Sequence, residues 1–294
     1  MTRPDRMEAG IADLLNLLEL EQLEVNLFRG ESRDVGSPQV FGGQVLGQAL
    51  SAASATVVRR VVHSLHAYFL RRGDFNAPIV YQVDRSLDGH SFSNRRVVAI
   101  QHGEQIFTMA ASFQVIEEGL DHQIDMPAVP SPEELPDQSA PPPEMARHMP
   151  ERLKQYFAQP RPFQFRLVPD RGGEQHEAGR PEPARQVWFK AVGQLPDDER
   201  LHRNLLAYAS DFFLLGTSML PHGTEFAGRL VMASLDHAMW FHRPLRVDDW
   251  LLYAMESPSA SGARGFARAE VFSRDGRLVA TIAQEGLVRI KRGK

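Results

Sequence analysis

Hydrophobic and polar positions follow the same order twice along the chain: a small-residue apolar stretch, then runs of extended character. In the first half the stretch lies at 41–54, and the first run follows at Val61–Leu70. In the second half the stretch lies at Leu205–Leu220, and the first run follows at Val231–Phe241. Long apolar stretches favour helices, and shorter apolar or alternating runs favour strands. Each half is therefore expected to begin with one helix and one strand.

Three further extended runs follow in each half. The dipeptides His102-Gly103 and Asp275-Gly276 separate the last two runs of their halves and are typical of hairpin turns. One helix followed by four strands, repeated, predicts two α+β units, each with an antiparallel sheet packed on one long helix. The runs are Ile79–Asp84, Arg95–Ile100 and Ile106–Val115, then Trp250–Glu256, Gly265–Ser273 and Leu278–Ile290.

Proline marks the segment between the two halves. Eight prolines lie from Pro127 to Pro150, and proline resists the interior of both helices and sheets. Within this segment and its continuation we expect a short helix at Glu151–Phe157 and an extended piece at Phe163–Val168. The chain is accordingly divided into an N-terminal unit at 1–118, a Pro/Gly-rich connection at 119–185 and a C-terminal unit at 186–294 that carries the candidate catalytic residues.

Composition excludes several functional classes. The 294 residues are 43% hydrophobic and 24% charged, as in soluble globular proteins. A formal net charge of −4 gives no support to nucleic-acid binding. The chain has no cysteine, which excludes disulfides and thiolate chemistry. The segment Ile11–Leu23 is interrupted by acidic residues, so an amphipathic helix is expected there rather than a secretory signal or a membrane span. A cytoplasmic enzyme with no membrane partner is the expectation.

Common catalytic and cofactor motifs are missing. The sequence contains no G-x-S-x-G, no G-x-G-x-x-G and no G-x-x-x-x-G-K-[ST], so it does not favour an α/β-hydrolase, a dinucleotide-binding fold or a P-loop. His237 and His242 are five residues apart on a predicted strand and should face opposite sides of the sheet. We therefore expect no metal site.

Asp211 is the only charged residue between Leu205 and Leu220. Its expected helical neighbours are apolar or aromatic, and none can neutralise it. Burial of a carboxylate is costly and raises its pKa. Two interpretations stay open: Asp211 lies on a polar helix face or pairs with a distant arginine, or it is a general base or acid in a pocket.

Two further polar residues interrupt apolar runs of the second half. Gln284 shares a strand face with apolar residues of the last run. For Ser234, taken alone, we favour the interpretation that it is a small residue tolerated beside a sheet. Three such groups in one half carry more weight than each singly, and we expect one active site per chain. The first-half positions that match them by the repeat lie near Gly43 or Gln44, around His63, and at Ala111.

Six segments resemble the acyl-CoA thioesterase II (TesB-like) family, to which the peroxisomal acyl-CoA thioesterases also belong. The resemblance covers nearly the whole chain and is weak across the proline-rich connection. The segments are 41–50 (FGGQVLGQAL), 62–70 (VHSLHAYFL), 89–97 (GHSFSNRRV), 206–211 (LAYASD), 235–244 (LDHAMWFHRP) and 284–286 (QEG).

The resemblance implies a double hotdog fold, in which two tandem α+β units are fused and each long helix is wrapped by its own antiparallel sheet. It implies hydrolysis of medium- to long-chain fatty acyl-CoA to free fatty acid and CoA, without a cofactor, by a homo-oligomer (dimer or tetramer). The family's catalytic aspartate, hydroxyl residue and glutamine fall on Asp211, Ser234 and Gln284. Some members carry threonine where this chain has Ser234, and the hydroxyl is kept.

These three residues would activate and orient a water molecule. Backbone N–H groups near Gly42 and Gly43 are expected to bind substrate, because glycine permits close approach, and His63 is expected to contact substrate as well. Two other functions stay open: a hotdog hydratase or dehydratase that acts on enoyl-CoA, and a non-enzymatic acyl-CoA- or lipid-binding module.

Overall fold

The computed structural model describes residues 3–36, 39–137, 161–169, 182–223 and 229–291. The first part of the chain forms α1 (Arg3–Leu18), β1 (Glu21–Glu24), β2 (Leu27–Gly30), α2 (Gly42–Ala55), β3 (Val61–Phe69), β4 (Ile79–Asp88), β5 (Phe92–Gln101) and β6 (Glu104–Gln114). The second part forms η1 (Pro132–Glu134), β7 (Phe163–Leu167), β8 (Ala184–Ala191), α5 (Glu199–Ala209), α6 (Leu214–Thr217), η2 (Leu220–His222), β9 (Leu230–Ser234), β10 (Asp236–Phe241), β11 (Leu251–Ser261), β12 (Arg264–Ser273) and β13 (Leu278–Ile290).

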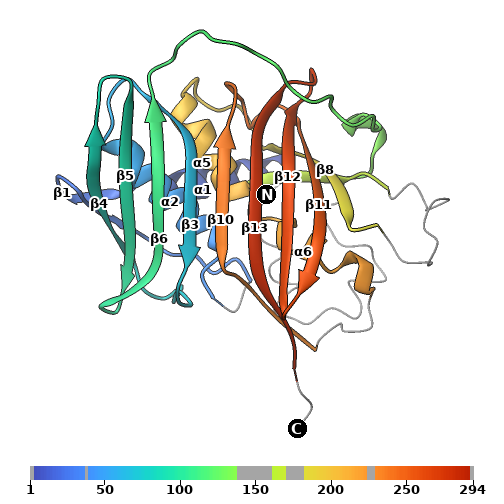
Figure 1. The fold of residues 1–294 in the computed structure, drawn as a ribbon, viewed down its shortest axis with the longest axis horizontal. Helices are drawn as coiled ribbons and strands as arrows, with labels where there is room; N and C mark the ends of the chain where they lie inside the picture. The colour runs from blue at the N-terminus through green and yellow to red at the C-terminus, as the bar shows by residue number, and fades with distance from the viewer. Residues whose placement is uncertain (1–2, 37–38, 138–160, 170–181, 224–228, 292–294) are drawn as a thin grey trace.

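All strands lie in one antiparallel sheet, in the order β1-β2-β4-β5-β6-β3-β10-β13-β12-β11-β8-β7, with β9 on β13 (Figure 1). The four strands β4-β5-β6-β3 of the first unit and β11-β12-β13-β10 of the second have the same connectivity. The two units join where β3 pairs with β10, for example at His66 and Ala238. This α+β architecture confirms the double hotdog expected from the sequence.

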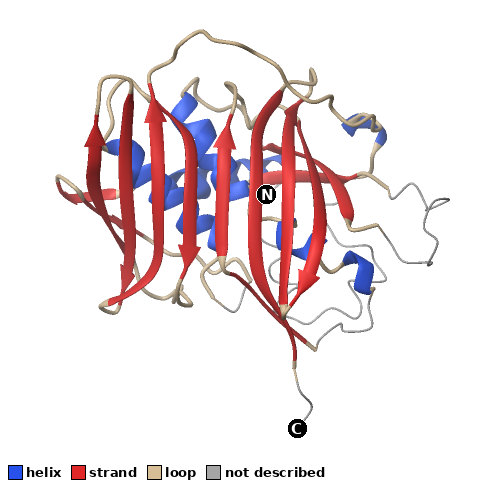
Figure 2. Ribbon diagram, viewed as in Figure 1, coloured by secondary structure: helices blue, strands red, loops and turns tan. Residues whose placement is uncertain are grey.

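The two main helices lie on the same face of the sheet, behind the strands in Figure 2. They run antiparallel in close contact, because glycines on α2 face the backbone of α5. A Cβ at Gly43 would lie 2.3 Å from the carbonyl oxygen of Tyr208, and one at Gly47 would lie 3.3 Å from that of Asn204. The absence of a side chain at these positions therefore brings the start of α2 against the end of α5.

One hydrophobic core extends through both units. Leu46 of α2, Leu206 of α5, Leu65 of β3 and Ile282 of β13 belong to it, and each has 0% of its surface exposed. Burial of a side chain of this size contributes roughly 1.5–3 kcal/mol. The halves are thus repeated in sequence but share a core, against which the end of α5 is packed.

The second apolar stretch does not form one long helix, so the prediction for Leu205–Leu220 was wrong. α5 ends at Ala209, and only the short α6 follows after a turn. The hydroxyl of Tyr253 donates to the carbonyl oxygen of Ser210 at 2.6 Å, which holds the residue after α5 against β11. Phe213 then adopts a left-handed φ of 67°, which ends the helical path.

The extended run predicted at Val231–Phe241 is interrupted at Leu235. β9 and β10 both pair with β13, but between the pairs Ser234–Gly286 and Ala238–Ala283 their chain has one residue more than β13. An extra residue of this kind is a β-bulge, which bends the strand and changes the direction of side chains. The bulge lies beside Ser234. The direction of the Ser234 side chain therefore cannot be predicted from the alternation of side chains along an uninterrupted strand.

The connection between the units is fastened to the second unit. Beyond β6 the chain passes along the upper edge in Figure 1, where Gln123 Nε2 donates to the carbonyl oxygen of Gly276 at 2.8 Å. Further along, Trp188 Nε1 donates to the carbonyl oxygen of Pro130 at 3.0 Å. β7 confirms the extended piece expected at 163–168 and adds an edge strand to the sheet. The helix expected at 151–157 lies outside the described residues, and the three-part division stays a prediction.

The N-terminal amphipathic stretch is only partly helical, because α1 ends at Leu18 and β1 follows. In the part of the chain that the structure describes, no helix has the length and apolar character needed to cross a membrane. The expected cytoplasmic location stays a prediction.

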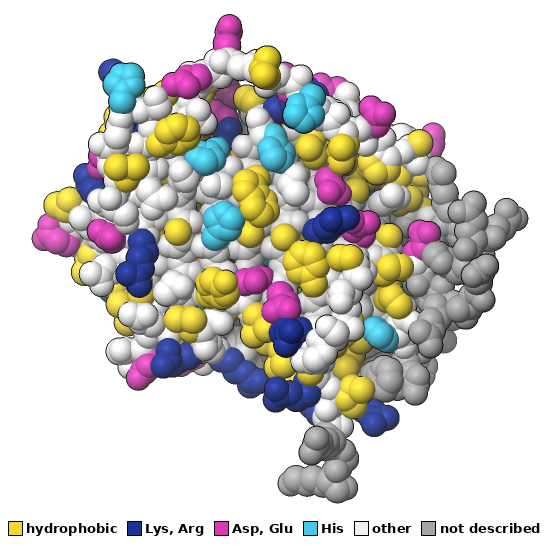
Figure 3. Space-filling view, in the orientation of Figure 1, with side chains coloured by type: hydrophobic (Ala, Val, Ile, Leu, Met, Phe, Trp, Pro, Cys, Tyr) yellow, Lys and Arg dark blue, Asp and Glu magenta, His cyan; other side chains and the backbone are white. Residues whose placement is uncertain are grey.

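The outer face of the sheet carries hydrophobic and histidine side chains among polar ones (Figure 3). Tyr68 of β3 is 60% exposed and Trp240 of β10 is 37% exposed. The ring of His66 contacts that of Trp240, with centroids 5.2 Å apart. The helices cover only the inner face, so this outer face is open to solvent in the single chain.

Candidate active site

Asp211 lies in the turn after α5 and faces the start of α2. The backbone N–H of Gly43 donates to Asp211 Oδ2 at 3.0 Å. A Cβ at Gly42 would lie 2.7 Å from the same oxygen, so a side chain there would displace the carboxylate. The positive end of the α2 dipole also favours a negative charge at this position. The carboxylate belongs to the second unit but is held by the first.

Gln284 brings Asp211 and Ser234 together. It lies on the inner face of β13 and has 0% of its surface exposed. Its Nε2 donates to Asp211 Oδ1 at 2.7 Å and to Ser234 Oγ at 3.0 Å. The Oε1 of Gln284 is buried and accepts no hydrogen bond from the described residues. The three predicted catalytic residues therefore meet from β13, the α5–α6 turn and the end of β9, with one buried acceptor free.

The pKa of Asp211 reflects this enclosure. Burial raises the pKa of its carboxyl to about 6, although hydrogen bonds from Gln284, Gly43 and Ser234 act in the opposite direction. The carboxylate is thus ionised near neutral pH but has a higher proton affinity than an ordinary aspartate. These are the properties of a general base that works near pH 7.

The turn that carries Asp211 is held by residues that the sequence pattern did not single out for this role. Ser210, the residue before Asp211, has its Oγ 2.9 Å from His237 Nε2, and its carbonyl oxygen accepts from Tyr253. Burial lowers the pKa of His237 to about 3, so its ring is neutral at ordinary pH. Complete burial of a histidine cannot be deduced from local spacing, because the partner Ser210 is on another element.

The prediction that His237 and His242 face opposite sides is confirmed. His237 has 0% exposure, whereas His242 lies on the outer side with its Nε2 2.8 Å from Thr281 Oγ1. Among the residues that the structure describes, no group of three or more histidine, aspartate or glutamate side chains is placed to hold a metal ion.

His63 does not join the other predicted site residues. It lies near the start of β3, where its Nε2 is 2.8 Å from Ser112 Oγ. Phe69, at the other end of the same strand, is the residue that approaches Gly42. Six residues of extended strand span roughly 20 Å. The structure therefore gathers Gly42, Gly43 and the three predicted catalytic residues but leaves His63 near the opposite end of the strand.

Two cavities adjoin the carboxylate site. One, of about 220 Å³, reaches Gly42 and Ser234 and is lined on its outer side by Arg71 and Arg72. The other, of about 260 Å³, is lined by Tyr208 and Phe212 together with apolar residues of α1 and β7. The ring of Phe41 contacts that of Phe212, with centroids 4.7 Å apart. Sequence patterns showed these aromatic residues only as apolar positions.

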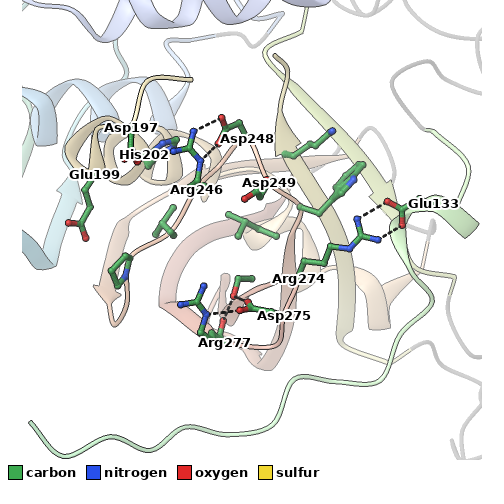
Figure 4. A pocket seen from close by; sticks show the side chains of 16 residues that line it. Glu133, Asp197, Glu199, His202, Arg246, Asp248, Asp249, Arg274, Asp275 and Arg277 are labelled. Atoms are coloured by element: carbon green, nitrogen blue, oxygen red, sulfur yellow. Dashed lines mark hydrogen bonds and ion pairs between the residues drawn. The ribbon is translucent and has the colours of Figure 1, made fainter. Parts of the chain in front are cut away.

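A larger cavity, of about 900 Å³, lies elsewhere and is lined by charged side chains (Figure 4). Its charges are largely paired, as with Arg246 to Asp248 at 2.9 Å and Arg274 to Glu133 at 2.8 Å. None of Asp211, Ser234 and Gln284 lines it. Paired surface charges of this kind contribute little to the free energy of folding. They also provide no reactive group.

Comparison with known proteins gives this site its context. The family model described as acyl-CoA thioesterase matches residues 158–287, and the acyl-CoA thioesterase N-terminal domain matches residues 30–114. The chain is 44% identical over 280 residues to acyl-CoA thioesterase 2 of Haemophilus influenzae, covering 94% of this chain and 97% of that protein.

Solved structures show the same fold. An acyl-CoA thioesterase II, TesB2, from Mycobacterium marinum superposes with a TM-score of 0.79 at 44% identity, covering 95% of this chain and 99% of that one. A protein described as having a hot dog fold, from Alicyclobacillus acidocaldarius, superposes with a TM-score of 0.73 at 20% identity, covering 94% of this chain and 98% of that one. The chain therefore belongs to the acyl-CoA thioesterase II family and is an acyl-CoA thioester hydrolase with a double hotdog fold.

Proposed function

We propose that the protein hydrolyses medium- to long-chain fatty acyl-CoA to free fatty acid and CoA, by direct attack of a water molecule that Asp211 activates and that Gln284 and Ser234 orient. The observation that carries this proposal is the Gln284 amide, whose nitrogen bonds both Asp211 and Ser234 and whose oxygen accepts no hydrogen bond from the described residues. A water that donates one hydrogen to Gln284 Oε1 and the other to the carboxylate has both hydrogens fixed. Its lone pair is then directed at the substrate.

The reaction balances with these groups alone. Asp211 accepts a proton as the water oxygen bonds to the thioester carbonyl carbon, which gives a tetrahedral oxyanion. The C–S bond then breaks, and the protonated Asp211 gives its proton to the departing sulfur of CoA. A thiolate is a good leaving group, so no covalent acyl-enzyme is required. Each turnover consumes one water and returns the carboxylate to its ionised form.

The oxyanion requires a hydrogen-bond donor. The N–H of Gly43 already donates to Asp211. Gly42 is the first residue of α2 and lines the 220 Å³ cavity next to Ser234. The first N–H groups of a helix have no partner within the helix. We therefore assign the oxyanion donor to the Gly42 N–H and leave His63 without a role in the chemistry.

The acyl chain is assigned to the 260 Å³ cavity beyond Phe212. This residue follows Asp211 directly, and the cavity that it lines also contains Leu14, Leu17 and Phe163. The apolar part of this wall favours an alkyl chain through the hydrophobic effect, by roughly 0.8 kcal/mol for each buried methylene group. The rest of the lining is charged and consists of Asp13, Arg33, Asp34 and Arg161. A preference for medium or long chains follows from this assignment, because a longer alkyl chain buries more methylene groups in the cavity.

The activity is tested with palmitoyl-CoA and a thiol reagent. Free thiol is the expected product, whereas a hydratase would instead hydrate crotonyl-CoA and a binding module would release nothing. The Asp211→Asn variant should lower kcat by at least ~10²-fold, the usual scale of general-base catalysis. Asp249→Asn is the matched control, because Asp249 lies in the charged cavity away from the site. Near-wild-type turnover of a folded Asp211→Asn variant would remove Asp211 from the mechanism.

The role of Gln284 is tested separately. Gln284→Ala removes the amide that positions the water, so kcat should fall while acyl-CoA still binds. An unchanged kcat would reduce Gln284 to a residue of the core.

The acyl site is tested by filling the cavity. Val35 is half-buried at its edge, so Val35→Trp should reduce kcat/KM for palmitoyl-CoA much more than for hexanoyl-CoA. Val58→Trp is the control, since Val58 is 71% exposed and does not line the cavity. An equal effect on both chain lengths would place the acyl chain elsewhere.

A further inference from the structure

We propose that Arg72 binds a phosphate group of CoA at the outer end of the 220 Å³ cavity. This proposal rests on the acyl-CoA thioesterase function described above and names the part of the molecule that recognises the nucleotide end of the substrate. Arginine suits this task because its planar guanidinium can donate two parallel hydrogen bonds to a phosphate.

The cavity joins the arginines to the catalytic residues. Gly42 and Ser234 line it, together with Val45, which is only 4% exposed. Arg71 and Arg72 line the same cavity and are exposed. A thioester placed against Ser234 therefore has one continuous passage along which the rest of CoA can extend, and that passage ends at two cations.

Backbone hydrogen bonds hold the segment that carries the arginines. The N–H groups of Leu70 and Arg71 both donate to the carbonyl oxygen of Ile106, at 2.9 and 3.2 Å. The carbonyl oxygen of Gly73 accepts from the N–H of Val40 at 3.1 Å. A Cβ at Gly73 would lie 3.0 Å from Val40 Cβ, so the two segments approach closely. Backbone held in this way lowers the entropy cost of ligand binding.

The residues after this segment are fixed by the buried side chain of Gln101. Its Oε1 accepts from the N–H of Asp74 at 2.8 Å, and its Nε2 donates to the carbonyl oxygen of Asp74 at 2.7 Å. The carboxylate of Asp74 accepts from Asn76 at 2.9 Å and lies 3.2 Å from His102 Nε2. The acidic residue nearest to Arg72 in sequence is therefore engaged elsewhere.

The two arginines differ in what they contact. Arg71 pairs with Glu104 at 3.0 Å and donates to the carbonyl oxygen of Gln105 at 2.7 Å. Arg72 makes no hydrogen bond or ion pair with any other residue that the structure describes. Arg71 is thus largely neutralised and fixed, and Arg72 is the cation available to a ligand. A phosphate is the group of acyl-CoA that needs such a partner.

The test compares a CoA thioester with one that lacks phosphates. For decanoyl-CoA, Arg72→Ala should raise KM by at least about tenfold, the scale expected for a lost hydrogen bond to a charged group, with kcat changed by less than about twofold. For the decanoyl thioester of N-acetylcysteamine, the same variant should match the wild type. Arg96→Ala removes the same charge from the outer sheet face and should affect neither substrate. Arg72→Lys should recover part of the loss.

Decanoyl dephospho-CoA then identifies the phosphate. If Arg72→Ala no longer raises KM for this substrate, the 3′-phosphate is the group bound; if KM still rises, the diphosphate is bound. An unchanged KM for decanoyl-CoA, or an equal loss on the phosphate-free thioester, would overturn the proposal. If the wild type hydrolyses neither thioester, the proposed function fails instead. Calorimetric titration of Arg72→Ala with CoA, which should show weaker binding than the wild type, tests the phosphate site in that case.

Discussion

At the scale of single residues, the chemistry depends on Asp211 being both enclosed and hydrogen-bonded. Enclosure raises its affinity for a proton, and the three donors Gly43, Gln284 and Ser234 limit that rise. Removal of the donors would raise the pKa of the carboxyl further, and loss of enclosure would lower it. The balance between these two effects can be measured in the pH dependence of the reaction.

We expect kcat/KM to fall about tenfold for each unit of pH below about 6, because the protonated form of Asp211, whose pKa is about 6, cannot accept a proton from water. In Gln284→Ala this limb should move to higher pH, since the lost hydrogen bond had favoured the ionised form. Steady-state rates between pH 4.5 and 8, with saturating and limiting acyl-CoA, measure the acid limb of the wild type and its displacement in the variant. A limb near pH 4 in the wild type would contradict the raised pKa.

Asp211 also affects stability. Its pKa is about 6 in the folded protein, against 3.8 as the ordinary value. The unfolded chain therefore loses this proton first as the pH rises, and the stabilising contribution of the protonated form is lost as the pH passes about 6. The Tm of Asp211→Asn minus that of the wild type should increase between pH 4 and pH 7, because asparagine does not titrate. Calorimetry across this range measures the difference, and a Tm difference that stays constant would show that the pKa of Asp211 is normal.

At the scale of elements, the site exists because α5 ends at Ala209 and the chain then turns. The turn is held from the sheet side by Tyr253 of β11 and His237 of β10, both through Ser210. A helix continued past Ser210 would place Asp211 differently relative to α2. The position of the carboxylate is therefore decided by a hydrogen bond between a strand and the end of a helix.

Tyr253→Phe tests the role of the hydrogen bond between Tyr253 and Ser210. The change removes the 2.6 Å bond to Ser210 O, so the carboxylate becomes less well placed and kcat should fall several-fold with little change in KM. Stability should fall by about 1–2 kcal/mol, as for other buried hydrogen bonds. Tyr81→Phe is the matched control, because Tyr81 OH donates to Gln48 Oε1 at 2.7 Å inside the first unit. Both variants should lose stability, but only Tyr253→Phe should lose turnover.

At the scale of the whole molecule, the repeat supplies two similar units, but only the second carries the three residues proposed for catalysis. α2 ends at Ala55 and α5 at Ala209, so Val57 occupies the place after α2 that Asp211 occupies after α5. The prediction that Gly43 or Gln44 matches Asp211 in the repeat was wrong, because both residues lie at the start of α2 and not after its end. Val57 is 3% exposed and is part of the core. The first unit thus offers a hydrophobic residue where a base would be needed.

We therefore expect one equivalent of substrate analogue per chain. Titration of the protein with a tight, non-hydrolysable acyl-CoA analogue should saturate at one per chain. The residual activity of Asp211→Asn should not fall further when first-unit residues such as His63 are replaced. Saturation at two equivalents would show a second pocket in the first unit.

We also expect the chain to form a homo-oligomer. The family resemblance implies assembly, and Tyr68 and Trp240 are large apolar side chains exposed on the open face of the sheet. Exposed apolar surface of this kind favours association. Light scattering at micromolar concentration should give a multiple of 33.0 kDa. A species of single-chain mass alone would contradict the expectation.

Features that depend on local pattern could be predicted from the amino-acid sequence. Strand and helix periods predicted the repeated α+β units, because side chains alternate in strands and recur every 3.6 residues in helices. The lone charge at Asp211 and the amide at Gln284 stood out because each interrupts an apolar run. Their roles as base and orienting amide came from the family resemblance, since an isolated polar residue in a core can equally serve packing or pair with a distant group.

How these parts meet depends on contacts between elements that are far apart along the chain. Gly43 and Asp211 are 168 positions apart, and Gln284 and Asp211 are 73 apart, so no local pattern records that they touch. The end of α5, the bulge beside Ser234 and the distance of His63 from the site follow from contacts of this kind. Hydrophobic periodicity specifies which face of an element is buried, but not which face of another element it meets. The geometry of the proposed catalytic residues depends on which faces meet, and only the tertiary structure decides that.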